Sequence, residues 1–265
     1  QLPSAKWNQI ASSSHRSPSH FHGNENMSSL IEIAKRLVTS GKGILAADES
    51  APTIEKRFKG IGVTSTEDNR RDYRELLFRT AGLGQFISGV ILFDETLRQR
   101  AADITPLPEL LEGQGIIPGI KVDKGTSVLA MNPGDKITEG LDGLRERFAE
   151  YSRLGAQFSK WRAVITIGDA IPSSYCLEAN AHALARFAAL SQEMGLVPIV
   201  EPEVLMDGSH TIERCEEVTA AALATVFHAL TAHRVQFESM LLKPNMVVSG
   251  KDCPRQAGPH EVAEA

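Results

Sequence analysis

The sequence alternates short apolar runs with longer stretches of helical periodicity, and this alternation limits the possible fold more than any other feature. Each run is bounded by turn residues and carries few polar side chains, which is typical of a buried strand. Strands that alternate with helices favour a parallel sheet with right-handed crossovers. The six predicted strands are residues 43–47, 88–93, 116–122, 158–164, 197–200 and 240–242.

The spacers between these runs carry helix signals. A charged amphipathic run follows Ser65 and Thr66, and Gly155 and Gly195 are placed to end two of the helices. Apolar side chains at helical spacing predict one buried face between residues 177 and 188. The predicted helices cover residues 67–79, 138–154, a stretch that includes 177–188, and 211–233.

Composition excludes several classes of protein. The 265 residues include 28 Lys+Arg and 33 Asp+Glu, a formal net charge of −5, which gives no general attraction to nucleic acid or anionic membranes. No run approaches the roughly 18 apolar residues that a membrane helix needs. The three cysteines are far apart and form no CxxC pair, which excludes a disulfide scaffold and a zinc ribbon and fits a reducing compartment.

The amino-terminal segment differs from the remainder. The first 24 residues contain no Asp or Glu, six serines and three histidines, and cannot bury enough apolar surface to order themselves. We expect residues 1–26 to be a weakly ordered extension and residues 27–265 to form one domain. The acid-poor, Ser-rich composition weakly resembles an organelle transit peptide, and an upstream extension explains it equally well. A cytoplasmic location is the expectation otherwise.

Charged side chains stand at the carboxyl end of the predicted strands, except that Lys160 and Arg162 lie inside or at the end of the fourth strand. In a β/α barrel these ends converge on one mouth, where active sites lie, and an open doubly wound sheet also places functional groups there. The first strand–helix turn lacks the glycine-rich dinucleotide fingerprint and any Walker A motif, which disfavours nucleotide binding. The charged residues are Asp48, Glu49, Asp94, Glu95, Lys121, Asp123, Lys160, Arg162, Glu201, Glu203 and Lys243.

Such a mouth suits amine chemistry. A lysine surrounded by cations in a partly dry pocket has a lowered pKa, and its free amine can attack a carbonyl to form a Schiff base. Nearby carboxylates can move the protons, and the surplus cations suit a sugar phosphate. Interleaved lysines make a metal cluster less expected. Taken singly, Lys243 is more often a solvated rim residue, and the glutamates of EPE more often form salt bridges.

The chain contains the segments LAADES, IEKR, NRRDYRELLF, SGVILFDETL, KVDKG, KWR, VEPE and LLKPNMV. Together these segments resemble one family, the class I (Schiff-base) fructose-1,6-bisphosphate aldolases. The resemblance runs from about residue 40 to about residue 252, and its motifs are jointly very specific. It implies a TIM (β/α)8-type barrel, a phosphosugar substrate, no cofactor, no metal, and a homo-oligomer, often a tetramer.

The resemblance also implies roles for individual residues. Lys243 would be the nucleophile and Glu201 the proton donor and acceptor in carbinolamine dehydration, assisted by Lys160. Asp48 would move protons in carbon–carbon cleavage, and Glu203 would pair with the active-site lysines. The remaining matches concern positioning of the lysine–carboxylate cluster or substrate hydroxyls and phosphates: Lys121, Ser50, Lys56, Arg57, Arg70 and Arg162.

The chain departs from the family at its carboxyl end. Only six of the eight barrel strands can be assigned, and no serine–glycine-rich phosphate loop resembling SGGQ occurs. We therefore expect an incomplete barrel with two open edges and little or no aldolase activity. Two alternatives stay open: another Schiff-base aldolase acting on a different phosphosugar, and a non-catalytic scaffold that keeps the fold.

Overall fold

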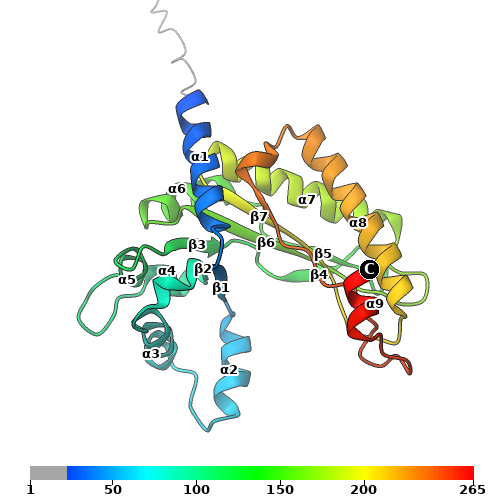
Figure 1. Ribbon diagram of the computed structural model, residues 1–265, viewed down its shortest axis with the longest axis horizontal. Coiled ribbons are helices and arrows are strands. Elements are labelled where there is room, and N and C mark those ends of the chain that lie inside the picture. The colour runs from blue at the N-terminus through cyan, green and yellow to red at the C-terminus, as the bar shows by residue number, and fades with distance from the viewer. Residues whose placement is uncertain (1–22) are drawn as a thin grey trace, which may run out of the picture.

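The computed structural model describes residues 23–265, and its centre is one six-stranded parallel sheet (Figure 1). The strand order is β1-β2-β3-β6-β7-β8, so each strand of the sheet pairs with the next one along the chain. A separate antiparallel hairpin, β4 and β5, follows β3. The strands are β1 (Gly43–Ala47), β2 (Ile87–Leu92), β3 (Ile117–Lys121), β4 (Thr126–Val128), β5 (Lys136–Thr138), β6 (Phe158–Ile165), β7 (Val197–Val204) and β8 (Leu241–Leu242).

Helices connect the strands, and the two longest, α7 and α8, lie together along one face of the sheet (Figure 1). The first turns of α3 and α8 are capped as the sequence predicts. The hydroxyl of Thr66 accepts a hydrogen bond from a backbone N–H group of α3, and that of Thr211 accepts one from α8. The helices are α1 (Gly23–Leu37), α2 (Ala51–Lys59), α3 (Glu67–Phe78), α4 (Asp94–Arg98), α5 (Leu107–Glu112), α6 (Leu144–Arg153), α7 (Ser174–Glu193), α8 (Ile212–Ala232) and α9 (Pro259–Glu264), with single 3-10 turns η1 (Leu83–Gln85) and η2 (Phe237–Ser239).

The predicted fold class is confirmed: the sheet is an incomplete TIM-type α/β half-barrel. All six predicted strands are present, with β7 four residues longer than expected. The predicted helix at 138–154 is wrong over its first turns, because residues 136–138 pair with 126–128 as a hairpin. Gly140 (φ 127°) and Gly143 (φ 64°) adopt left-handed backbone conformations, so the helix begins only at Leu144.

The boundary expected at residue 27 falls inside α1, which begins at Gly23. Residues 1–22 of the predicted extension lie outside the described residues. The apolar face of α1 packs against the inward-facing side of the sheet at the amino ends of the strands. This inner cluster contains Leu30, Ala34, Leu37, Ile91, Ile117, Phe158, Val197 and Ile199.

Glycine is required where the inner cluster is tightest. A Cβ atom on Gly119 of β3 would lie 2.3 Å from the ring of Phe158 on β6, so the ring occupies the space of the missing side chain. The outward side of the sheet packs its own apolar residues, among them Trp161, against the helices. Both faces of the strands are therefore covered at their amino ends.

The sheet ends in two open edges. Within residues 23–265, β1 pairs only with β2, and β8 pairs only with β7. A cavity of about 360 Å³ lies between these edges, lined by the end of α1, by β1 and by β8. Lys243, immediately after β8, lies on its wall.

Candidate active site

Four charged residues from different strands, Asp48, Lys160, Glu201 and Lys243, meet on the inward-facing side of the sheet. Parallel pairing places Glu201 of β7 beside Arg162 of β6, and continuing the β7–β8 register places Lys243 beside Glu201. Asp48 directly follows β1. Because alternate residues of a strand face the same side, the inner apolar cluster continues along each strand into this charged cluster.

Lys160 is the centre of the cluster. Its Nζ lies 2.6 Å from Asp48 Oδ2 and 3.2 Å from Glu201 Oε2, and all three side chains are buried. Burial alone lowers the pKa of Lys160, but the carboxylates of Asp48 and Glu201, with Asp123 further away, outweigh it, so the net shift is upward. Lys160 is therefore a fixed cation, suited to electrostatic stabilisation rather than to nucleophilic attack.

Lys243 contacts the other oxygen of the same carboxylate. Its Nζ donates a hydrogen bond to Glu201 Oε1, so Glu201 bridges the two lysines. The side chain of Lys243 is 48% exposed, in contrast to the partly dry pocket predicted from the sequence. The reason is its position at the open edge, where no strand among the described residues covers β8. An accessible amine beside a buried carboxylate can both attack a carbonyl and exchange protons.

The predicted pairing of Glu203 with the active-site lysines does not occur. Glu203 instead accepts a hydrogen bond from Arg162 Nε. Glu203 lies two residues beyond Glu201 on β7, whereas Lys160 is already held by Asp48 and Glu201. The cluster thus has a buried lysine–carboxylate layer and, above it, a more exposed arginine–glutamate layer.

Lys121 lies beside Lys160 in the β3–β6 register. Its Nζ is 3.3 Å from Asp123 Oδ1, and the Asp123 side chain is largely buried. Asp123 also accepts a hydrogen bond from the backbone N–H of Gly125. The carboxylate of Asp123 therefore lies between Lys121 and the loop that leads to the hairpin, and contacts both.

The remaining predicted residues lie on α2 and α3 around the mouth. Ser50 is the residue before α2, with its hydroxyl 3.2 Å from that of Thr53. Lys56 is exposed on α2, and Arg57 donates to Glu49. Arg70 of α3 forms a two-point contact with Glu95, at 2.6 and 2.7 Å. None of these four side chains contacts the Lys160 cluster directly, so they form an outer ring.

One charged residue of the site was not singled out from the sequence. Arg74 of α3 is only 3% exposed, and its Nη2 lies 2.9 Å from Glu49 Oε2. Burial lowers the pKa of Arg74 despite the opposing charge of Glu49. Its contact with Glu49 connects α3 to the β1–α2 turn that carries Asp48. The available signal in the sequence is the spacing of four between Arg74 and the apolar Phe78, which places both on one face of the helix, and both are buried.

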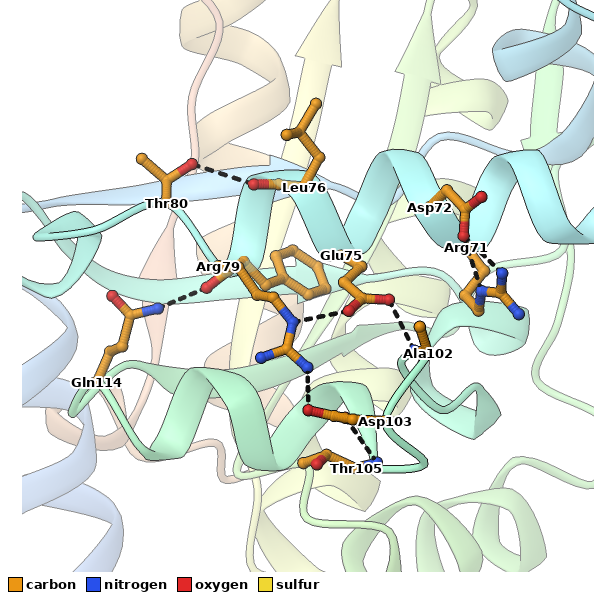
Figure 2. Close-up of polar contacts among 11 residues, drawn as sticks. Arg71, Asp72, Glu75, Leu76, Arg79, Thr80, Ala102, Asp103, Thr105 and Gln114 are labelled. Atoms are coloured by element: carbon orange, nitrogen blue, oxygen red, sulfur yellow. Dashed lines mark hydrogen bonds and ion pairs between the residues drawn. The ribbon is translucent and has the colours of Figure 1, made fainter.

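The opposite side of α3 is anchored as well (Figure 2). Arg79 contacts Glu75 at 2.7 Å and Asp103 at 2.5 Å, and Glu75 accepts the backbone N–H of Ala102 at 2.9 Å. Asp103 accepts a further bond from the N–H of Thr105. This network joins α3 to the loop before α5, so Arg70 and Arg74 project from a helix that is held on two sides.

No group of three or more His, Cys, Asp or Glu side chains among residues 23–265 is arranged to hold a metal ion. None of the helices in that range is long and apolar enough to cross a membrane.

The fold and the site together define a β/α-barrel type of protein with a lysine–carboxylate cluster on the inward-facing side of its strands. The family model for class I fructose-bisphosphate aldolase matches residues 29–265. A probable class 1 fructose-bisphosphate aldolase from Xanthomonas campestris is 59% identical over 236 residues, covering 89% of this chain and 71% of the relative. The chain belongs to the class I fructose-bisphosphate aldolase family.

More distant relatives agree. Fructose-bisphosphate aldolase 1 of Toxoplasma gondii is 55% identical, covering 88% of this chain and 65% of the relative. Among solved structures, the fructose-bisphosphate aldolase of Plasmodium falciparum, in complex with TRAP and a small-molecule inhibitor, superposes with a TM-score of 0.88 at 49% identity. That match covers 90% of this chain and 69% of the solved one.

Proposed function

We propose that Lys243 forms a Schiff base with the C2 carbonyl of fructose 1,6-bisphosphate and that the chain's chemistry is reversible cleavage to dihydroxyacetone phosphate and glyceraldehyde 3-phosphate. The observation that carries this proposal is the bridge: the two oxygens of Glu201 contact the Nζ atoms of Lys243 and Lys160. One lysine is accessible and the other is a buried cation. Nucleophile, proton carrier and electrostatic partner therefore lie within direct contact of one another.

Each step balances with groups at the site. Lys243 first gives its ammonium proton to Glu201, and the free amine that results adds to the carbonyl. Glu201 then returns that proton to the hydroxyl of the carbinolamine, which leaves as water and gives the iminium. In the cleavage step the C4 hydroxyl gives its proton to Asp48 while the C3–C4 bond breaks, and the bonding electrons move into the iminium. Asp48 then returns its proton to C3 of the enamine, which re-forms the iminium. Water hydrolyses this iminium, which returns the amine and releases dihydroxyacetone phosphate.

Lys160 acts electrostatically in this scheme. Its raised pKa keeps it protonated, so it stabilises the ionised forms of Glu201 and Asp48 between proton transfers. The iminium is the electron sink, so the proposed mechanism requires neither a metal nor another cofactor.

The outer ring, together with Arg162 and Lys121, is proposed to bind the phosphates and hydroxyls of the substrate. Guanidinium groups suit phosphate because they offer two parallel donors. The proposed residues are Arg57, Arg70, Arg162, Lys56, Lys121 and Ser50, with Glu203 holding Arg162 in place. Because three of the arginines already contact carboxylates, phosphate binding would exchange one anionic partner for another.

We further expect a cytoplasmic homo-oligomer with no nucleic-acid or membrane partner. The Arabidopsis relatives named as cytosolic aldolases support the location.

We also propose that this 265-residue chain turns over fructose 1,6-bisphosphate slowly. Lys243 is half-exposed at a sheet edge, and water that reaches the site weakens every electrostatic contribution there. A coupled assay of triose phosphate release measures the rate. Turnover at a rate ordinary for an enzyme, roughly 1 per second or more, would contradict this proposal.

The covalent step is tested separately from turnover. Borohydride added with dihydroxyacetone phosphate should increase the intact mass of the chain by one reduced adduct, and Lys243→Met should abolish the increase. Lys124→Met, which removes an exposed lysine nearby, is the matched control and should leave the adduct unchanged. A wild-type chain that gains no adduct would favour the second candidate, a non-catalytic protein that keeps the fold.

A further inference from the structure

The segment that carries Lys243 is held to the sheet by very few backbone hydrogen bonds. Strand β8 has two residues, which pair with Ile199 and Val200 of β7, and the N–H of Lys243 then donates to the carbonyl of Val200 at 2.9 Å. In a parallel ladder the carbonyl of Lys243 would next accept the N–H two residues further along β7. That residue is Pro202, which has no N–H.

A second proline, Pro244, follows Lys243 directly on the other strand. The N–H that it lacks would face the open edge rather than β7, so the break in the β7–β8 ladder comes from Pro202. The next N–H of β7 that faces β8 belongs to Val204, and it needs a partner because Val204 is buried.

Asn245 supplies that partner with its side chain. Its Oδ1 accepts the N–H of Val204 at 3.2 Å, in place of a backbone carbonyl of a continuing strand. Its Nδ2 donates to Thr219 Oγ1 on α8 at 3.0 Å and to the carbonyl of Met246 at 3.0 Å. One amide group thus joins the segment after β8 to the end of β7 and to α8.

We infer that Asn245 is a positioning residue for Lys243: its amide replaces the interrupted ladder and holds the lysine against Glu201. The inference rests on the proposed function in its chemical part, because it assumes that Lys243 is the nucleophile. An amide is suited to this role because it both accepts and donates, as a peptide group does. Because Lys243 lies at an open edge, no strand on its other side within the described residues restrains it.

The test combines a structural and a chemical readout in the full chain. Amide hydrogen exchange of Lys243 and Val204 reports on the clamp, and the rate of borohydride trapping with dihydroxyacetone phosphate reports on the amine. For Asn245→Ala we expect exchange at both amides to rise at least about tenfold and the maximal trapping rate to fall roughly tenfold to hundredfold. The half-saturating concentration of dihydroxyacetone phosphate should change little, because the proposed phosphate ligands are untouched.

Asn180→Ala is the matched control. Asn180 is a buried asparagine of α7 whose amide also bonds backbone groups, those of Lys136, Cys176 and Thr138. Its removal should lower stability without changing exchange at Lys243 or trapping. If Asn245→Ala does not fold, Thr219→Val removes only the acceptor on α8, and a fall of roughly threefold in trapping is expected.

The possible outcomes separate the two proposals. Wild-type exchange and trapping rates in Asn245→Ala would overturn the inference, and so would an equal effect of Asn180→Ala on trapping. If the wild-type chain forms no adduct, the proposed function fails, and the exchange rates alone decide whether Asn245 holds the segment. Faster exchange at Lys243 would then support the clamp, and unchanged exchange would overturn it.

Discussion

The two ends of the inward-facing side of the sheet use the same strands for opposite purposes. At the amino ends, Phe158, Val197 and Ile199 form a dry cluster closed by α1. Further along the same two strands, toward their carboxyl ends, Lys160 and Glu201 form a buried charge cluster. The apolar cluster gives way to the charged cluster within two residues on each strand, from Phe158 to Lys160 on β6 and from Ile199 to Glu201 on β7.

This difference teaches where stability and chemistry reside. The apolar end buries large side chains and contributes most of the hydrophobic free energy of this side of the sheet. The charged end desolvates three ionised groups, which gains little net stability even when they are paired. Substitutions at the two ends should therefore differ in what they change, and the following predictions test that separation.

The largest expected change in stability is at the apolar end. Phe158→Ala should lower the free energy of unfolding by about 3–5 kcal/mol, because it leaves a cavity between Gly119 and α1. Urea unfolding followed by circular dichroism measures it. Phe86→Ala is the control, since Phe86 is exposed, and should change stability by less than about 0.5 kcal/mol. Equal losses of unfolding free energy in the two variants would contradict the view that the apolar cluster around Phe158 stabilises the fold.

Breaking the buried ion cluster should have the next largest effect. Lys160→Met leaves the buried carboxylates of Asp48 and Glu201 without their shared cation, and we expect a loss of about 3 kcal/mol. The double variant Lys160→Met with Asp48→Asn should recover part of the loss, because one of the unpaired charges is gone. A double variant less stable than Lys160→Met would contradict the pairing.

A smaller effect is expected from overpacking. Gly119→Ala should cost about 1–3 kcal/mol, since its Cβ would overlap the ring of Phe158. Adding Phe158→Leu to Gly119→Ala should cost less than the sum of the two single changes. Additive costs would show that the two residues are not in contact.

The pH dependence of stability distinguishes the two ends further. The folded-state pKa of Lys160 is raised above its ordinary value of 10.5, so its stabilising contribution is complete below about pH 10.5 and is lost as the pH rises through the folded-state pKa. The stability difference between wild type and Lys160→Met should therefore narrow between pH 9 and pH 12. Thermal melts at these pH values measure it, with Phe158→Ala as the control whose difference stays constant. A stability difference between wild type and Lys160→Met that grows as the pH rises would contradict the raised pKa of Lys160.

The smallest change in stability is expected at the proposed nucleophile. Lys243→Met removes a half-exposed side chain and leaves Glu201 paired with Lys160, so the free energy of unfolding should change by less than about 1 kcal/mol. Urea unfolding of Lys243→Met and of Lys160→Met compares how much each lysine contributes to the free energy of unfolding. A loss as large as that of Lys160→Met would mean that Lys243 has a structural role.

The sequence predicts much of this arrangement because its signals are local. Apolar runs mark the strands, charged residues follow them, and Thr66 and Thr211 mark helix starts. The hairpin at 126–138 was not predicted, because strands of three residues carry no clear periodicity. The helix start was predicted too early, because Gly140 and Gly143 beyond the hairpin adopt backbone conformations that a helix does not allow.

Pairings across strands were harder to predict. Glu203 was expected to pair with a lysine but accepts a hydrogen bond from Arg162. Lys160 is already paired with Asp48 and Glu201, and one sequence does not show which carboxylates lie closest to each cation. The roles of Arg74 and Asn245 depend on contacts with residues 25 or more positions away, to Glu49, Thr219 and Val204. Such contacts leave no pattern in one sequence.

Peptide mapping of the borohydride-trapped chain tests the central claim most directly, because three lysines lie at the same mouth. The account predicts that the dihydroxyacetone phosphate adduct lies on Lys243 alone, since Lys160 is a buried cation and Lys121 is paired with Asp123. An adduct on Lys160 or Lys121, or an unmodified Lys243 in an otherwise labelled chain, would contradict it.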